Sequence, residues 1–200
     1  MKAILFLTSA LLIFNVPSFS QDIKMDGFTV KDYASLEPKV NGNNIYRSDI
    51  NHYRIKIPKS WSINKPNSIG VEFNAVDPLG MATMNVHVTH FDNPPKKDAH
   101  DFPVSEALNG FKQIMPITIL LESKKTYVNN LKCLHVKVKS NIKSLDDDYY
   151  IITRNYVFLR GNRMISLTYQ VIEEFDTEYS TIFEDSVLSF VFEDHLYKIK

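Results

Sequence analysis

The strongest constraint on the fold is a Gly161-Asn162 pair between two stretches of alternating residues. Gly and Asn adopt the positive φ angles that a two-residue hairpin turn requires. Folding the chain there predicts four opposed pairs: Phe158 with Ile165, Tyr156 with Leu167, Arg154 with Tyr169, and Ile152 with Val171. Apart from Arg154, this face is apolar, and the other carries the polar residues Thr153, Asn155, Thr168 and Gln170. The stretch therefore predicts two antiparallel strands with one face buried.

A second hairpin is predicted at Asp77-Pro78-Leu79-Gly80, where Asp, Pro and Gly occupy positions that suit a type I turn. Closing the strands directly on this turn predicts the pairs Ala75 with Ala82, Phe73 with Met84, Val71 with Val86, and Ile69 with Val88. The opposite face then holds Glu72, Asn74, Thr83 and Asn85. Asn129-Asn130 predicts a third hairpin turn, with a register that the pattern leaves open.

Two helices are predicted from apolar residues at helical spacing. The first has Pro103 in its first turn, ends at Pro116, and has the apolar positions Val104, Ala107, Leu108, Phe111 and Ile114. The second has the apolar positions Phe175, Tyr179, Ile182, Phe183 and Val187, and a short strand at 189–192 follows it. Hairpin-linked strands with packed helices predict an α+β fold, an antiparallel β-sheet flanked by helices.

The N-terminus has the pattern of a signal peptide over residues 1–20. Lys2 precedes an apolar run that is too short to span a bilayer, and Ser18 and Ser20 are the small residues expected before a cleavage at Gln21. We therefore expect an exported, soluble protein, periplasmic or extracellular, without membrane insertion. Residues 21–45 are polar and weakly periodic, which predicts an N-terminal extension that wraps the domain or stays mobile. Residues 46–200 are predicted to form a single domain.

Composition excludes several classes of protein. A hydrophobic content of 44% argues against disorder. The 23 Lys and Arg residues balance 23 Asp and Glu residues, so the basic surface typical of nucleic-acid binding is not expected. Cys133 is the only Cys, which rules out an intramolecular disulfide and leaves burial to stabilise the fold.

Possible metal ligands occur near a Pro-rich loop. His87 and His90 are three apart on a predicted strand and point to opposite faces. A loop site could instead use the set His90, Asp98, His100 and Asp101. This set lacks the spacing of known metal motifs, so solvated loop residues are the preferred interpretation. Asp146-Asp147-Asp148 likewise favours a polar turn over a calcium loop. We expect no metal and no cofactor.

No catalytic residue is predicted. Cys133 and His135 share a face of one predicted strand, but their Cα atoms are then roughly 7 Å apart, and a dyad needs hydrogen-bond contact and a third group. An inert, half-buried thiol beside a surface His is the preferred interpretation. The sequence contains no P-loop, dinucleotide fingerprint or nucleophile elbow. We therefore expect a protein that is not an enzyme.

Arg154 and Tyr169 are the candidate residues for binding a ligand or partner. Arg154 interrupts an apolar face opposite Tyr169, so its guanidinium could lie over the phenol ring. The preferred interpretation places the Arg stem at the sheet margin with its head in water. The alternative points the head into a pocket, where it would meet a carboxylate or another anion.

The order of elements resembles the PsbP-like superfamily. The matching features are the Tyr53–Trp61 opening, Tyr156-Val157-Phe158 with Gly161, Tyr179-x-x-Ile182-Phe183, and Ser189-Phe190. The resemblance covers residues 46–193 and implies an α/β/α sandwich used for protein binding or assembly, without shared chemistry. No functional residue of the family matches a position here.

Two functions remain open. The first is an exported, non-catalytic binding or assembly module that acts on a protein partner in the bacterial envelope. The alternative is a periplasmic small-ligand or metal-binding carrier. A flat, exposed apolar patch would favour the first, and a clear concave pocket with coordinated ligand density would favour the second.

Overall fold

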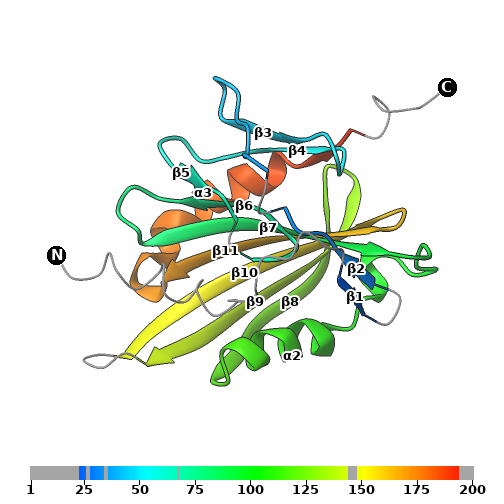
Figure 1. Cartoon of the computed structure of the whole chain (residues 1–200). Coiled ribbons are helices and arrows are strands. Elements are labelled where there is room, and N and C mark those ends of the chain that lie inside the picture. Colours follow the sequence, from blue (N-terminus) through cyan, green and yellow to red (C-terminus); the bar gives the residue numbers. More distant parts are fainter. Residues whose placement is uncertain (1–22, 26–27, 34–35, 67, 144–147, 194–200) are drawn as a thin grey trace.

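The computed structural model describes residues 23–25, 28–33, 36–66, 68–143 and 148–193. Nine strands form one antiparallel sheet: β1 (Ile23–Met25), β2 (Phe28–Val30), β5 (Ser62–Asn64), β6 (Val71–Val76), β7 (Ala82–Phe91), β8 (Thr118–Val128), β9 (Leu131–Lys143), β10 (Asp148–Arg160) and β11 (Arg163–Ile172). The main order is β1-β2-β7-β11-β10-β9-β8, and β6 and β5 extend the sheet beside β7. Figure 1 shows the long strands β8 to β11 side by side.

A second sheet and two helices complete the described fold. The sheet has the order β12-β4-β3 and contains β3 (Ile45–Ser48), β4 (Tyr53–Lys56) and β12 (Val191–Phe192). The helices are α2 (Val104–Ile114) and α3 (Asp176–Leu188), each preceded by a short 3₁₀ segment, η3 (Ala99–Asp101) and η4 (Glu173–Phe175). Pro103 caps α2 instead of lying in its first turn. Neither described helix has the length and continuous apolar character of a membrane-spanning segment.

The hairpin between β10 and β11 has the predicted register. Phe158 pairs with Ile165, and the pairing continues in step to Ile152 with Val171. Gly161 has a φ of 60°, as a two-residue hairpin turn requires. The predicted turn between β8 and β9 is also present, with positive φ angles of 49° at Asn129 and 64° at Asn130.

The predicted register of the hairpin between β6 and β7 is wrong by two residues. The type I turn forms, with the Gly80 amide donating to the Asp77 carbonyl at 3.0 Å. However, the strands close at Asp77 with Ala82, so Ala75 pairs with Met84. The twist of a type I turn does not suit a two-residue hairpin, so a longer loop with Gly80 at a φ of 72° is needed. A shift of two keeps residues 73–76 and 83–86 on their predicted faces, whereas Val71 lies beyond a register shift and pairs with His87.

The two faces of the large sheet carry separate clusters of buried residues. One face packs against α3 and the small sheet through a large cluster that includes Tyr156, Leu167 and Phe183. The other packs against α2 through Leu134, Val136, Val138 and Val157. This arrangement confirms the α+β class and the sandwich of helices around a sheet (Figure 1). Ile114 and Ile182, both predicted on apolar helix stripes, are exposed.

Part of the predicted N-terminal extension belongs to the large sheet. Thr29 of β2 pairs with His90 at the end of β7. Tyr33 is 2% exposed and lies in the main cluster of buried residues. These contacts tie residues 28–33 to the domain. The predicted signal peptide (1–20) and most of the predicted Asp146–Asp148 turn lie outside the described residues.

Candidate functional site

Arg154 is buried beneath α3. It lies directly opposite Tyr169, as predicted, but its Nη1 donates to Oδ1 of Asp176, the first residue of α3. Its guanidinium carbon lies 5.6 Å from the ring centre of Phe183, so it stacks on that ring and not on Tyr169. The preferred interpretation of a solvated head at the sheet margin is therefore wrong, because α3 covers this face and supplies the carboxylate.

Asp176 and Tyr169 complete these internal contacts. Lys137 Nζ donates to Asp176 Oδ2 at 2.8 Å. Burial by itself raises the pKa of Asp176, but the bonds from Arg154 and Lys137 outweigh it and lower the pKa below its ordinary value. Tyr169 is fully buried and donates to Ser186 Oγ at 3.1 Å. Arg154 and Tyr169 thus hold α3 on the sheet, and their role in binding a ligand stays a prediction.

The alternative metal site does not assemble. In the described part of the chain no three His, Cys, Asp or Glu residues lie together as a metal would require. Asp98 caps η3 and pairs with Lys132, and His100 Nε2 lies 2.8 Å from the Thr126 carbonyl oxygen. His90 lies 3.4 Å from the Tyr33 hydroxyl. These residues therefore serve local structure.

Cys133 and His135 are both buried in the sheet. Burial raises the pKa of the Cys133 thiol to about 12, so very little thiolate exists near neutral pH. His135 stacks on Tyr156 with 4.4 Å between ring centres. Burial lowers the pKa of His135 to about 4, which keeps the imidazole neutral. The expectation of a surface His was wrong, because the aromatic ring of Tyr156 and the sheet cover it.

Glu72 is a buried carboxylate that sequence reasoning placed on a polar strand face. A β-bulge between Val71 and Phe73 changes the alternation, and Glu72 becomes 3% exposed. Its Oε1 accepts from Ser48 Oγ at 2.8 Å and from Asn51 Nδ2 at 2.6 Å, and its Oε2 accepts from Tyr53. Burial raises the pKa of Glu72 above its ordinary value despite these bonds. In the neighbouring sequence, Gly70 is the only sign of an irregular backbone, and it has a φ of 79°.

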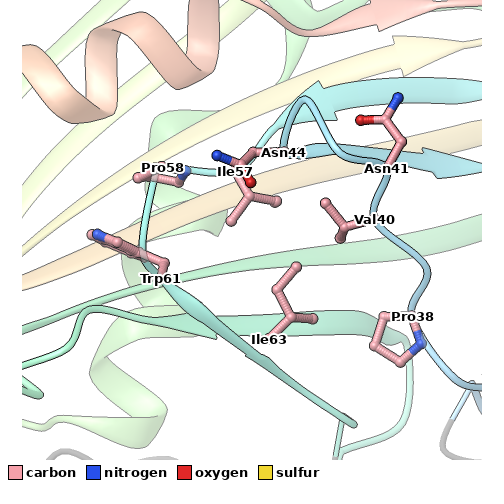
Figure 2. A pocket seen from close by; sticks show the side chains of 8 residues that line it. All are labelled: Pro38, Val40, Asn41, Asn44, Ile57, Pro58, Trp61 and Ile63. Atoms are coloured by element: carbon pink, nitrogen blue, oxygen red, sulfur yellow. The ribbon is translucent and has the colours of Figure 1, made fainter.

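An open hollow of about 350 Å³ lies beside Trp61, and more of its exposed surface is polar than apolar. We call it the Trp61 pocket, and its lining residues are Pro38, Val40, Asn41, Asn44, Ile57, Pro58, Trp61 and Ile63. Figure 2 shows the side chains of Val40, Ile57 and Ile63 around the same space, with Trp61 at its margin. No charged side chain lines the pocket. Val40, Ile57 and Ile63 offer apolar contacts beside Asn41 and Asn44, so it suits an uncharged side chain.

The structure holds Trp61 in place from the side of the core. The indole packs edge-on against Phe183 at 6.2 Å between ring centres and lies 6.3 Å from Tyr179, both on α3. Asn41 shapes the opposite wall, since its Oδ1 accepts from the amides of Asn43 and Ile45, each at 3.0 Å. The pocket is therefore built on supported walls. The sequence feature that could have indicated this pocket is the lone Trp after Pro58.

A second hollow of about 540 Å³ has a different character. Its lining combines the cations Arg54 and Lys56 with apolar and neutral polar residues, namely Asn43, Ile45, Ile55, Asn129, Leu188, Ser189 and Val191. Glu193 lies 3.4 Å from Arg54 and partly neutralises it. This hollow suits an anionic group with an apolar part.

Comparison with known proteins identifies the fold. No protein-family model and no curated protein match the sequence. The cyanobacterial PsbP (CyanoP) of Synechocystis matches with a TM-score of 0.59 and 13% identity, over 76% of this chain and 95% of that chain. The Ran-binding protein Mog1p of Saccharomyces cerevisiae matches with a TM-score of 0.54 and 7% identity, over 79% and 98%. A protein of Bacteroides thetaiotaomicron matches with a TM-score of 0.52 and 10% identity, over 76% of this chain but 49% of its own. The chain therefore has the predicted PsbP-like fold.

Proposed function

We propose that this protein is an exported, non-catalytic module that binds or helps to assemble a protein partner in the bacterial envelope. The partner would place an apolar side chain in the Trp61 pocket. Export is inferred from the signal-peptide pattern of residues 1–20.

The Trp61 pocket is the observation that carries this proposal. Small ligands usually occupy enclosed clefts that bury most of their surface, whereas this hollow is open. A rigid aromatic side chain at the edge of a hollow is typical of the anchor points of protein interfaces. The pocket thus fits a side chain that a partner presents better than it fits a free small molecule.

The fold supports the same proposal, and so does the lack of a catalytic arrangement among the residues that the structure describes. Mog1p, which shares the fold, is described as a Ran-binding protein and so has a protein partner. Among the described titratable groups with shifted pKa values, Cys133, His135 and Glu72 are buried. None of them lines the Trp61 pocket.

The second hollow favours an alternative function, a periplasmic carrier of a small anionic ligand. Arg54 and Lys56 would meet the anionic group, and Leu188 and Val191 would contact its apolar part. A metal-binding carrier has less support, since the described residues provide no cluster of metal donors.

The test is a pull-down from the native envelope with the tagged mature protein. Trp61→Ala removes the indole, and Val40→Thr changes the polarity of the pocket with little change in shape. Leu79→Ala is the matched control, because Leu79 is a large apolar residue that is 63% exposed and lies outside the pocket. We expect both pocket variants to lose a partner that Leu79→Ala retains.

The wild-type protein can also be used to distinguish the proposed function from the carrier alternative. Trp61 is the only Trp of the chain, so its fluorescence reports directly on the pocket. A purified partner should shift the emission of the wild-type protein. Retention of every partner by both pocket variants would reject the Trp61 pocket. Binding of a low-mass anion that is weakened by Arg54→Ser would instead favour the carrier.

A further inference from the structure

The outer edge of β8 carries an unusual concentration of exposed apolar side chains. β8 pairs with β9 on one side, and no described strand pairs with its other side (Figure 1). The exposed large apolar residues of this strand and of the short loop before it are Ile117 (54%), Ile119 (58%), Leu120 (38%), Leu121 (48%) and Tyr127 (60%). An exposed edge of this length with apolar residues readily pairs with another strand.

The strand is protected against indiscriminate pairing only in part. Its register shifts between Leu120 and Glu122, so a β-bulge interrupts the edge, and Lys124 and Lys125 follow. Bulges and lysines are common ways to discourage edge pairing. They leave the aliphatic residues Ile117, Ile119, Leu120 and Leu121 exposed, and they restrict which strand can be accepted.

The charges of β8 are complementary to those of a second β8 in antiparallel orientation. Glu122 and Lys124 lie on either side of Ser123. They share one face of the sheet, because their partners on β9 are Lys137 and His135, two residues apart. If Ser123 faces Ser123 of a second copy, Glu122 of each copy faces Lys124 of the other. Opposite charges at directly opposed positions stabilise antiparallel pairs.

The same register brings apolar residues of each copy next to the second half of the other strand. The aliphatic residues 119–121 then lie beside residues 125–127 of the second copy. Lys125 can cover them with its methylene stem, and the exposed ring of Tyr127 offers further apolar surface. Within one copy, Glu122 Oε1 lies 3.9 Å from Lys124 Nζ and 3.9 Å from His135 Nδ1, and Glu122 and Lys124 are both more than 40% exposed. Pairing across copies therefore competes with weak contacts.

We propose that β8 joins two copies of this chain in an antiparallel pair centred on Ser123, which makes one continuous sheet across a homodimer. No residue that lines either hollow belongs to β8. Dimerisation is thus independent of the function proposed above, and either can fail without the other.

The test is a set of charge reversals on the full mature chain, followed by sedimentation equilibrium over a concentration series. With Glu122→Lys, position 122 of each copy becomes a lysine opposite Lys124 of the other copy, so the dimer contains two repulsive pairs. Lys124→Glu likewise produces two pairs of opposed glutamates. We expect each single change to weaken dimerisation by about tenfold or more. The double variant Glu122→Lys/Lys124→Glu should restore it, and an equimolar mixture of the two single variants should form heterodimers.

Lys59→Glu is the matched control, because Lys59 is exposed and lies in the loop after β4. Circular dichroism of every variant checks that the fold is retained. A wild-type protein that stays monomeric up to millimolar concentration would overturn the proposal. So would a dimer that the single reversals leave unchanged, or one that the double reversal fails to restore.

Discussion

The phenol of Tyr53 donates a hydrogen bond to the carboxylate of Glu72, and the two side chains are 0% and 3% exposed. Tyr53 begins β4 of the small sheet, whereas Glu72 lies in β6 of the large sheet. Ser48 and Asn51, next to β4, donate to the same carboxylate. A buried acid thus connects the two sheets, and its three donors offset part of its desolvation.

Glu72→Gln should stabilise the protein progressively, relative to wild type, as the pH rises. Burial raises the pKa of Glu72 above its ordinary 4.5, so the folded state binds this proton more tightly than the unfolded state. Its contribution is fully present below about pH 4.5 and is lost as the pH rises through the folded pKa. Urea unfolding at pH 4, 6 and 8 measures the effect. Exposed Glu106→Gln is the control, and parallel pH profiles for Glu72→Gln and wild type would contradict the prediction.

Arg154→Ala should lower the free energy of unfolding by about 2–4 kcal/mol, because it leaves Asp176 in a partly buried position with one cation fewer. The contact to Phe183 is also lost. Lys112→Ala, an exposed change on α2, should have an effect below about 0.5 kcal/mol. Denaturant melts compare the two. A stable Arg154→Ala protein that no longer binds its partner would return Arg154 to the binding site.

His135→Phe should make the protein more resistant to mild acid. The pKa of His135 falls from 6.5 to about 4 on folding, so wild type loses stability as the pH falls from 6.5 toward 4. Linkage gives a loss of about 1–2 kcal/mol at pH 5 from this residue. Phe keeps the ring stacked on Tyr156 and does not titrate. His87 has a similarly lowered pKa of about 4 and should retain its own share of the acid loss. The test is the free energy of unfolding of both proteins at pH 7 and pH 5. An equal loss of stability between these pH values in both proteins would count against the prediction.

Cys133 should react with a thiol reagent about a hundredfold more slowly in the native protein than in the unfolded protein at pH 8. Its thiol is fully buried and its pKa is raised to about 12. The rate should rise when denaturant is added, because reaction then requires opening of the sheet. Labelling of the native protein as fast as that of a free peptide would show an accessible thiolate.

Local chemistry accounts for the predictions that the structure confirms. The register of β10 and β11 follows from a turn pair and strict alternation, both of which are contained within 20 neighbouring residues. The predicted β6–β7 register was wrong although the turn was correctly placed. The number of residues in the loop depends on whether the twist of the turn matches the twist of the two strands. An alternating pattern predicts which face of the sheet each residue occupies. It does not predict how many residues the loop between the strands contains.

The amino-acid sequence alone determined the α+β class, two helices, the hairpin turns and which faces are apolar, because each depends on neighbours along the chain. Tertiary structure decided what those faces meet. Arg154 pairs with Asp176 because α3 packs over it, and Glu72 is buried because a bulge turns it toward Ser48, Asn51 and Tyr53. The Trp61 pocket likewise combines segments 38–44 and 57–63. Such sites depend on contacts between segments whose relative positions only the packing of the whole core establishes.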